Sequence, residues 1–352
     1  MTQRWKQRPP GSNWGEFGLD DQRGRMNWVT REKVLQGIAE AKEGISFCLS
    51  LPLDYPGGTA LNPRRNPPRL AATMRDAGKN KGRQNYCYAL AADNPDLTDV
   101  ICDDVVLMTL QYSTQWDSFA HIGSRYDANG DGEPEIVFYH GFRAGEDIVP
   151  APEQPSAEPW ARYEGTQAKA LGIQHLAEHG AQGRGVLVDL HHHYGRERHA
   201  VTYDELMRVL DADKVQVERG DMLCFYTGFA DVILELRKNP DPKLLHGTCS
   251  GLEGRDDRLL KWVSDSGVAC LIADNFAVEL IPTSITKPRP HAAMPLHEHC
   301  IFKNGIHLGE LFYLTELARW LRAHGRNRFL LTAPPLRLPG AVGSPATPIA
   351  TV

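Results

Sequence analysis

The sequence predicts an α/β fold, and two observations support this class. The chain has 352 residues, 41% hydrophobic and 24% charged, which is the balance of an ordinary folded protein with a sizeable core. From residue 168 onward, segments with helical periodicity alternate with short apolar runs. Such alternation is typical of sheets covered by helices. We see no internal repeat, and we expect one domain with insertions.

The alternating segments can be placed in order along the chain. We expect helices at residues 168–176, 203–212, 256–266 and 314–324. We expect strands at residues 185–190, 221–226, 268–273 and 327–331. The first hundred residues are rich in turn formers, although 45–51 alternates like a strand and 103–112 is a second strand candidate.

Composition excludes several classes of protein. A net charge of −5 argues against a nucleic-acid partner, since phosphate binding requires clustered basic side chains. No run approaches the roughly 18 apolar residues of a spanning helix, and the N-terminus lacks the apolar region of a signal peptide. Seven cysteines without a C-x-x-C pair are typical of a reducing compartment. We therefore expect a cytoplasmic protein without membrane attachment that acts on a small molecule.

A carboxylate and an imidazole lie four residues apart in the stretch TQWDSFAHIG, residues 114–123. On their own, Asp117 and His121 are as well explained by a local hydrogen bond in a turn. Downstream, however, HEH at residues 297–299 and the carboxylate Glu310 supply similar groups from a separate part of the chain. Carboxylates and imidazoles from distant segments are the ligands that a divalent cation needs.

The chain here resembles the metal-dependent cyclase-like hydrolases, which include bacterial kynurenine formamidase and isatin hydrolase. Their signature H-x-G-T-H-x-D-x-P-x-H aligns in register with QYSTQWDSFAH, residues 111–121. Thr114, Asp117 and His121 match it. The departures are Gln111, Ser113, Gln115 and Phe119.

Four later segments are similar to the same family. They are RGVLVD at 184–189, GDMLCFYTG at 220–228, WVSDSGV followed by ADN at 262–275, and PLRLPGAVGSP at 335–345. The resemblance implies a swivelling β/β/α architecture with mixed sheets and flanking helices. It implies a hydrolase domain over residues 45–352 with an insertion around 125–180, an N-terminal extension at 1–44, and a homodimer or homotetramer.

The resemblance also implies roles for individual residues. Asp117 would be a bridging metal ligand and His121 the acid/base. Glu310 would be the downstream carboxylate ligand and His297 the downstream imidazole, with His299 as an alternative because the spacing to Glu310 is one residue longer than expected.

Gln111 and Gln115 occupy the positions of two ligand histidines. A glutamine carbonyl is a neutral, hard oxygen donor that suits Mn²⁺, Mg²⁺ or Ca²⁺ better than Zn²⁺, so we expect Mn²⁺ to be favoured over zinc. Three outcomes remain open. They are one ion on Asp117, His297 and Glu310 with help from the glutamines, two harder ions, or no metal at all.

Several further residues are candidates for contact with substrate. Trp116, Phe119 and Phe276 would form an aromatic wall, with core packing as the equally good alternative. Asp274 matches the family's substrate-side aspartate. His191–His193 follow an expected strand, where at most two of the three imidazoles share a face, and a hydrogen-bonded strand end is the simpler interpretation.

The sequence therefore predicts a hydrolase that cleaves the C–N bond of a small amide, lactam or imide, with metal-activated water and His121 as acid/base. Two alternatives stay open. One is a lyase or cyclase of the same fold, and the other is a metal-free, catalytically silent small-molecule binding protein. Retention of both Asp117 and His121 favours an enzyme, because a binder needs no acid/base pair.

Overall fold

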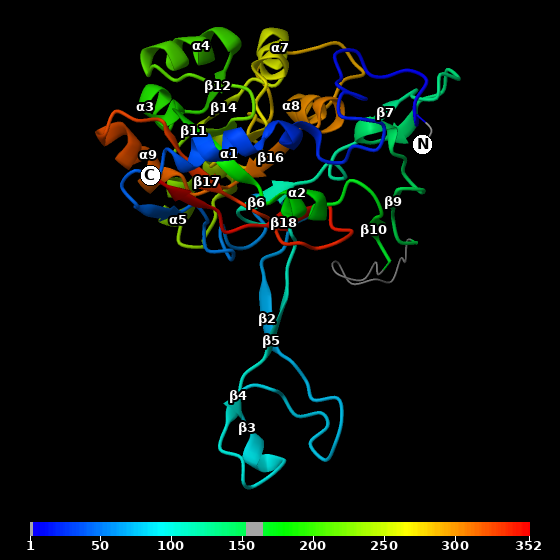
Figure 1. Cartoon of the computed structure of the whole chain (residues 1–352), viewed down its shortest axis with the longest axis vertical. Coiled ribbons are helices and arrows are strands. Elements are labelled where there is room, and N and C mark those ends of the chain that lie inside the picture. Colours follow the sequence, from blue (N-terminus) through cyan, green and yellow to red (C-terminus); the bar gives the residue numbers. More distant parts are fainter. Residues whose placement is uncertain (1–2, 153–164) are drawn as a thin grey trace.

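A computed structural model describes residues 3–152 and 165–352 as a body from which a narrow arm projects (Figure 1). The body is built around a nine-stranded mixed sheet. In spatial order its strands are β1 (Ser46–Cys48), β19 (Ile349–Thr351), β17 (Arg328–Thr332), β11 (Gln182–Asp189), β13 (Met222–Tyr226), β15 (Cys270–Ala273), β16 (His307–Glu310), β6 (Gln115–Asp117) and β18 (Gly343–Pro345). The four strands β11, β13, β15 and β16 are parallel, and their flanking neighbours are antiparallel. The predicted α/β class with a mixed sheet is confirmed.

Helices cover both faces of this sheet because successive side chains of a buried strand point to opposite sides. Val186 and Val188 of β11 pack in one cluster with α4 (Tyr203–Ala212) and α7 (Asp257–Ser266). Leu187 lies in the second cluster, which contains the buried face of α9 (Thr315–Ala323). These three helices lie within two residues of their expected bounds.

Local capping explains why the predictions for these helices succeed. Thr202 and Glu205 form a capping box at the start of α4, where two otherwise unpaired backbone donors are satisfied. Asp256 accepts hydrogen bonds from the first backbone N–H groups of α7, and Gly267 ends that helix with a positive φ.

The remaining elements of the body are short. The helices are η1 (Gly24–Trp28), α1 (Arg31–Ile38), η3 (Tyr139–Gly141), α2 (Gln174–His179), α3 (Leu190–Tyr194), α5 (Phe229–Glu235), α6 (Pro242–Gly247), α8 (Pro295–His297) and the π-helix η4 (Glu298–Lys303). The paired strands are β7 (Ser124–Tyr126) with β8 (Glu135–Val137), β9 (Ile148–Val149) with β10 (Gln167–Ala168), and β12 (His199–Val201) with β14 (Ser250–Leu252). Among the described residues, no helix is both long and apolar enough to cross a membrane.

Three local predictions were wrong in detail. The helix expected at 168–176 begins only at Gln174, because residues 167–168 pair with β9 instead. The strand expected at 103–112 is confined to β5 (Asp104–Leu107), which belongs to the arm. His191–His193 lie in α3 rather than at a strand end, because Asp189 accepts a hydrogen bond from the backbone N–H of His192 and caps a helix there.

The N-terminal residues pack closely on the body. The indole Nε1 of Trp14 donates to the backbone carbonyl of Phe302, and Trp5 packs edge-on against Trp14. His140 accepts a hydrogen bond at Nε2 from the backbone N–H of Gly15. Part of the insertion expected around 125–180, residues 153–164, lies outside the described residues.

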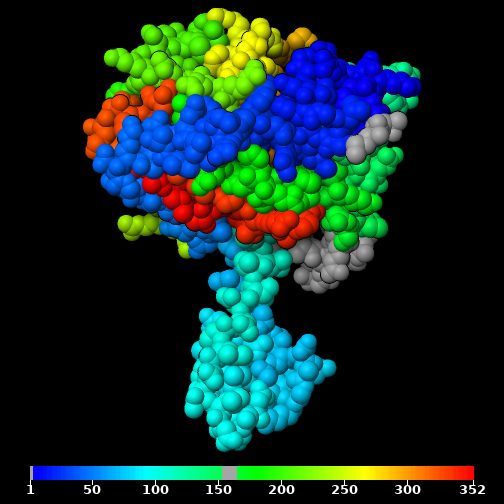
Figure 2. Space-filling view, viewed as in Figure 1, coloured from blue at the N-terminus to red at the C-terminus, as the bar shows by residue number. Residues whose placement is uncertain are grey.

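The arm consists of residues 69–107, and no feature of the sequence predicts that it projects from the body. β2 (Arg69–Ala72) pairs with β5 to form a two-stranded stalk, and β3 (Tyr88–Ala89), η2 (Leu90–Ala92) and β4 (Val100–Ile101) form its far end. The space-filling view shows the arm standing clear of the body (Figure 2).

Candidate metal centre and active site

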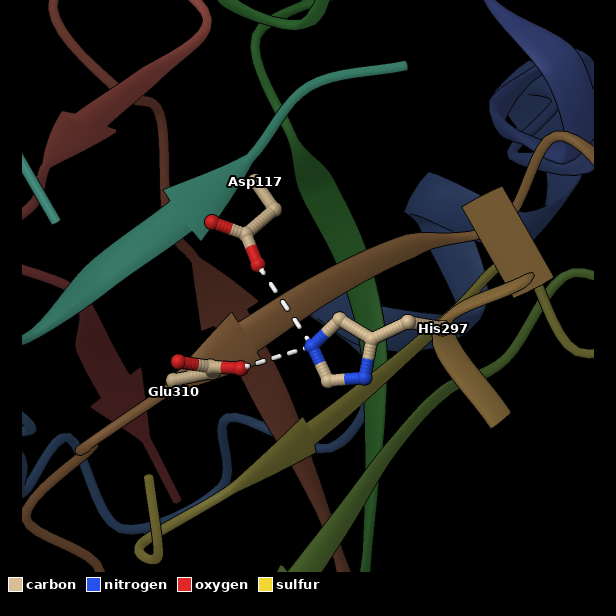
Figure 3. A group of neighbouring side chains, drawn as sticks. All are labelled: Asp117, His297 and Glu310. Carbon is tan, nitrogen blue, oxygen red and sulfur yellow. Dashed lines mark hydrogen bonds and ion pairs between the residues drawn. The ribbon is translucent and has the colours of Figure 1, made fainter. Parts of the chain in front are cut away.

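Two neighbouring strands and one short helix bring the expected metal ligands together. β6 and β16 are antiparallel, and their register places Glu310 directly opposite Gln115. Gln115 and Asp117 point to the same face of the sheet because they are two residues apart on one strand. His297 enters from α8 and completes the group (Figure 3).

The ligand atoms of these residues lie close enough to share one ion. Nε2 of His297 is 3.1 Å from Oε1 of Glu310 and 4.0 Å from Oδ2 of Asp117. One ligand atom from each residue lies within 4.8 Å of the others. All three side chains are at least 97% buried, so water screens their charges poorly.

Glu279 orients the imidazole of His297. Oε1 of Glu279 accepts hydrogen bonds from Nδ1 of His297, at 2.8 Å, and from the backbone N–H of the same residue. Oε2 accepts from the backbone N–H of Leu296. This arrangement leaves Nε2 facing Asp117 and Glu310, as in the carboxylate–histidine–metal triads of many metal sites.

Burial and charge perturb the titration of this cluster strongly. Burial acts to lower the pKa of His297, but the hydrogen bonds to Glu279 and Glu310 outweigh it and raise this pKa to about 10. Burial raises the pKa of Glu310, and the nearby carboxylate of Asp117 raises it further. Without a cation, the cluster thus holds a proton at His297 to offset the crowded carboxylates.

Gln115 lies between the two carboxylates. Its Nε2 donates hydrogen bonds to Oδ1 of Asp117, at 3.2 Å, and to Oε2 of Glu310, at 3.0 Å. Carboxylate oxygens only accept, so the amide presents its donor group to them. Its carbonyl Oε1 is buried and has no hydrogen-bond partner among the described residues.

The donor set fits a divalent cation. Oδ2 of Asp117 is also buried without a hydrogen-bond partner in the described part of the chain, which is costly for a polar atom unless something else binds there. Two carboxylates and one oriented imidazole would supply the ligands, and a half-turn of the Gln115 amide would add a carbonyl oxygen. Oxygen donors in the majority favour Mn²⁺ or Mg²⁺ over Zn²⁺.

A cleft of about 670 Å³ opens above this cluster. Glu310, His297 and His121 line it on the polar side together with Gln111. Apolar side chains that line it include Leu61, Tyr112, Phe276, Ile281 and Met294. The cleft is thus large enough for a small organic molecule, with charged groups at one place and apolar walls elsewhere.

His121 is placed as the expected acid/base. Its Nε2 is 3.8 Å from Oδ1 of Asp117, and its side chain borders the cleft. Burial lowers the pKa of His121, while Asp117 acts in the opposite direction. The imidazole is therefore neutral at pH 7 and can accept a proton.

Gln111 lines the cleft and packs against the backbone of β18. A Cβ at Gly343 would lie 2.4 Å from Nε2 of Gln111, so this glycine makes room for the amide. That Nε2 has no hydrogen-bond partner within the described residues. The structure brings Gln111 to the cleft, but not into the hydrogen-bonded cluster that contains Gln115.

Three of the four expected substrate contacts lie away from the cleft. Trp116 points to the opposite side of β6 from its neighbours and donates from Nε1 to the carbonyl of Ala333 in the core. Phe119 is fully buried and stacks on His307. For both residues the core-packing alternative describes the structure.

The third residue, Asp274, is buried and its carboxylate is occupied by hydrogen bonds within the protein. Its carboxylate accepts hydrogen bonds from the backbone N–H groups of Thr227 and Gly228 and from the Thr227 hydroxyl. Burial raises the pKa of Asp274 to about 6, against these hydrogen bonds. Of the four, only Phe276 lines the cleft.

The structure also shows the surroundings of the histidines whose roles the sequence did not decide. His299 points to Ser264, whose hydroxyl lies 2.8 Å from its Nε2, so His297 is the candidate ligand and His299 is not part of the cluster. In α3, His191 contacts the carbonyl of Gly195 and His193 contacts Asp213, and none of the three histidines lines the cleft.

Two residues of the site escaped the sequence analysis. Glu279 lies between Val278 and Leu280, and a lone acid in an apolar run is the signal that could have identified it. Arg65 belongs to a short basic cluster whose sequence is typical of a solvent-exposed loop. Its Nη1 nevertheless lies 3.7 Å from Oε2 of Glu310. Its contact partner is 245 residues away, so no local pattern reveals it.

The family model described as "Putative cyclase" matches residues 49–280. The chain belongs to this cyclase family. A solved structure described as a novel cyclase is 28% identical, with a TM-score of 0.71, and the match covers 98% of this chain and 100% of that one. The family resemblance predicted from the motif is thereby confirmed.

Two isatin hydrolases share the fold at lower identity. Isatin hydrolase A from Labrenzia aggregata, bound to benzyl benzoate, is 11% identical with a TM-score of 0.52, and the match covers 91% of this chain and 98% of that one. Isatin hydrolase A from Ralstonia solanacearum is 14% identical with a TM-score of 0.51, with 91% and 97% covered. Comparison with curated proteins gave no match.

Proposed function

We propose that this cyclase-family protein is a hydrolase that cleaves the C–N bond of a small amide, lactam or imide with the help of one divalent cation. The observation that carries the proposal is the buried cluster of Asp117, His297 and Glu310 beside the cleft, with His121 next to it. Solved isatin hydrolases with the same fold are consistent with this reaction class.

The cation would be held by Asp117, His297 and Glu310. When bound, such an ion lowers the pKa of water and polarises a carbonyl group. We favour Mn²⁺ over Zn²⁺ because oxygen donors predominate. We favour one ion over two because Nη1 of Arg65, 3.7 Å from Oε2 of Glu310, already places positive charge beside the carboxylates.

The protein's own residues would carry the proton transfers. The neutral imidazole of His121 takes a proton from the attacking water as the C–O bond forms. The same imidazole returns that proton to the nitrogen as the C–N bond breaks, so His121 ends each cycle neutral. Asp117, within 3.8 Å, stabilises the imidazolium formed between the two steps. Apolar walls such as Tyr112 and Phe276 exclude bulk water from the substrate.

Metal analysis separates this proposal from its alternatives. Protein stripped with a chelator and incubated with Mn²⁺ should bind one equivalent, measured by mass spectrometry of the metal. Asp117→Asn and Glu310→Gln should bind at most about a tenth of that, whereas Asp204→Asn, which removes a carboxylate exposed on α4, should leave the stoichiometry unchanged.

Activity is measured in parallel on formamides, cyclic imides and isatin. Hydrolysis by the loaded protein and none by the stripped protein is the expected result. If the folded protein binds no metal after Mn²⁺ or Zn²⁺ addition, the hydrolase mechanism is wrong, and a metal-free lyase or a binding protein becomes the better interpretation.

A further inference from the structure

Two of the exposed cysteines lie together at the far end of the arm (Figure 1). Sγ of Cys102 lies 3.9 Å from Sγ of Cys87, and it also accepts a hydrogen bond from the backbone N–H of Cys87 at 3.1 Å. The two residues are 15 positions apart in the sequence, so the fold of the arm brings them into contact.

Backbone pairing on both sides holds these cysteines opposite one another. β3 and β4 pair Tyr88 with Ile101, and the two cysteines are the next residues outward from this pair. Beyond them, the backbone N–H of Asp103 donates to the carbonyl of Asn85 at 2.6 Å. Opposed residues of antiparallel strands have Cα atoms about 4.5–5.5 Å apart, and disulfides span about 4.4–6.8 Å. A bond between the two sulfurs is therefore within reach of side-chain rotation.

The far end of the arm has almost no hydrophobic core to stabilise it. Across residues 69–107, Tyr88 is the only buried residue. Polar contacts hold this region instead, and Asp93 accepts hydrogen bonds from Arg75 and Asn80. Small folded units that cannot bury enough apolar surface are commonly held together by disulfides. A covalent link here would add stability that packing does not supply.

The other five cysteines are poorly placed to form such a link. Four of them are buried, and burial raises the pKa of each thiol, which disfavours the reactive thiolate. The fifth, Cys48, is exposed on β1 in the body, from which the arm stands clear (Figure 2). Cys87 and Cys102 are thus the pair that an oxidant in solution can reach and join.

A metal ion suits this pair less well than a disulfide does. Structural zinc sites almost always have four protein ligands. Within the described residues, the one group of three or more histidine, cysteine or acidic side chains that could share an ion is Asp117, His297 and Glu310. The two sulfurs of the arm therefore have no third ligand beside them.

We propose that Cys87 and Cys102 are an oxidative modification site, which a small disulfide such as oxidised glutathione converts into an internal disulfide of the arm. The thiolate of one cysteine attacks the small disulfide, forms a mixed disulfide and releases one thiol. The thiolate of the other cysteine then attacks the protein sulfur of the mixed disulfide and releases the second thiol. The protein loses two protons and two electrons, and the small disulfide takes them up as it becomes two thiols.

The link would restrain the far end of the arm by closing a loop over residues 88–101. Cross-linking a loop of about 15 residues removes enough chain entropy from the open state to lower its population roughly 100-fold. Proteases cut exposed segments when they open. Oxidation should therefore protect this loop from cleavage.

The test is to map the disulfide in the full-length protein. Protein purified in reductant is desalted and equilibrated with mixtures of reduced and oxidised glutathione at pH 8, because the hydrogen bond from Cys102 raises the pKa of Cys87. Free thiols are then alkylated in denaturant, and the chain is cleaved before its aspartates. Asp93, Asp96 and Asp99 lie between the two cysteines, so only a disulfide keeps the two peptides joined.

We expect the joined peptides in the wild type, with a fall from seven alkylated cysteines to five because two sulfurs are used. Cys48→Ser removes the exposed cysteine of the body and is the matched control, which should still form the link. Cys87→Ser should form no link. Chymotrypsin should cut between residues 88 and 101 at least ten-fold more slowly in the oxidised wild type than in the reduced protein, and Cys87→Ser should lose this difference.

Circular dichroism establishes that each variant is folded. A wild-type protein that keeps seven free thiols in excess oxidised glutathione would overturn the proposal. So would a link that joins two molecules or includes Cys48, or sulfurs that carry only glutathione, because the geometry requires a bond within one arm. Equal cleavage of the oxidised and reduced protein would show that the link does not restrain the arm. These readouts involve neither metal nor substrate, so they are independent of the proposed hydrolase activity.

Discussion

Replacing Glu279 by glutamine should weaken metal binding without displacing any ligand. Glu279 accepts a charge-assisted hydrogen bond from Nδ1 of His297 at 2.8 Å, and such bonds contribute about 1.5–3 kcal/mol against about 0.5–1.5 kcal/mol for neutral ones. The difference of about 1–1.5 kcal/mol corresponds to roughly ten-fold in Kd. Glutamine also turns a donor toward the backbone N–H of Leu296, which adds to the loss. We therefore expect Mn²⁺ to bind 10- to 100-fold more weakly.

Isothermal titration calorimetry of stripped protein with Mn²⁺ measures the effect. Glu298→Gln is the matched control, because Glu298 is the next acid on the adjoining π-helix and bonds to Ser124 rather than to His297. A folded Glu279→Gln variant whose Kd stays within two-fold of wild type would refute the reasoning. It would mean that Glu279 stabilises the fold without orienting His297 for a metal.

Three further predictions concern the acid/base, the core and the N-terminal segment. His121→Ala should lower kcat at least 100-fold while the bound metal stays near one equivalent; loss of the metal would instead make His121 a ligand. Trp116→Ala should reduce the free energy of unfolding in urea by about 3–5 kcal/mol, and a loss below 1 kcal/mol would contradict its place in the core. Burial lowers the pKa of His140 below 6.5 in the folded protein. As pH falls, the unfolded chain therefore binds a proton before the folded protein does. The stability that the neutral imidazole provides at pH 7 is thus lost progressively as pH falls through and below 6.5. Hydrogen exchange at the Gly15 amide, which donates to His140, should therefore be faster at pH 5.5 than at pH 7 after correction for intrinsic rates. The variant His140→Gln should abolish that difference. Equal protection of the wild-type amide at both pH values would show that this hydrogen bond is unimportant.

Features with local causes could be predicted from the sequence. The bounds of α4 follow from Thr202 and Glu205, and those of α7 from Asp256 and Gly267. Short apolar runs bounded by turn formers predicted three of the four parallel strands, β11, β13 and β15, but not β16. The relation to the cyclase family could be recognised because several motifs occur in the right order. Their order can be seen in the sequence without knowledge of any tertiary contact.

Features that depend on contacts between distant parts of the chain could not be predicted from the sequence. Whether Trp116 faces the cleft or the core depends on how β6 pairs with β16 and β18, whose residues follow almost 200 positions later or more. The same pairing carries Asp117 and Gln115 to the cleft side. The arm escaped notice because its strands are only two to four residues long, too short for periodicity to show.

The place of β6 in the sheet has a consequence for how the protein folds. Asp117 pairs with Leu308 on one side and with Gly343 on the other, so both contacts must close very long loops. Non-local pairings of this kind form slowly and late. Until β6 pairs with β16, nothing holds Asp117 next to Glu310, whatever the state of the parallel strands β11 to β15. The proposed metal site therefore exists only after β6 has paired with β16.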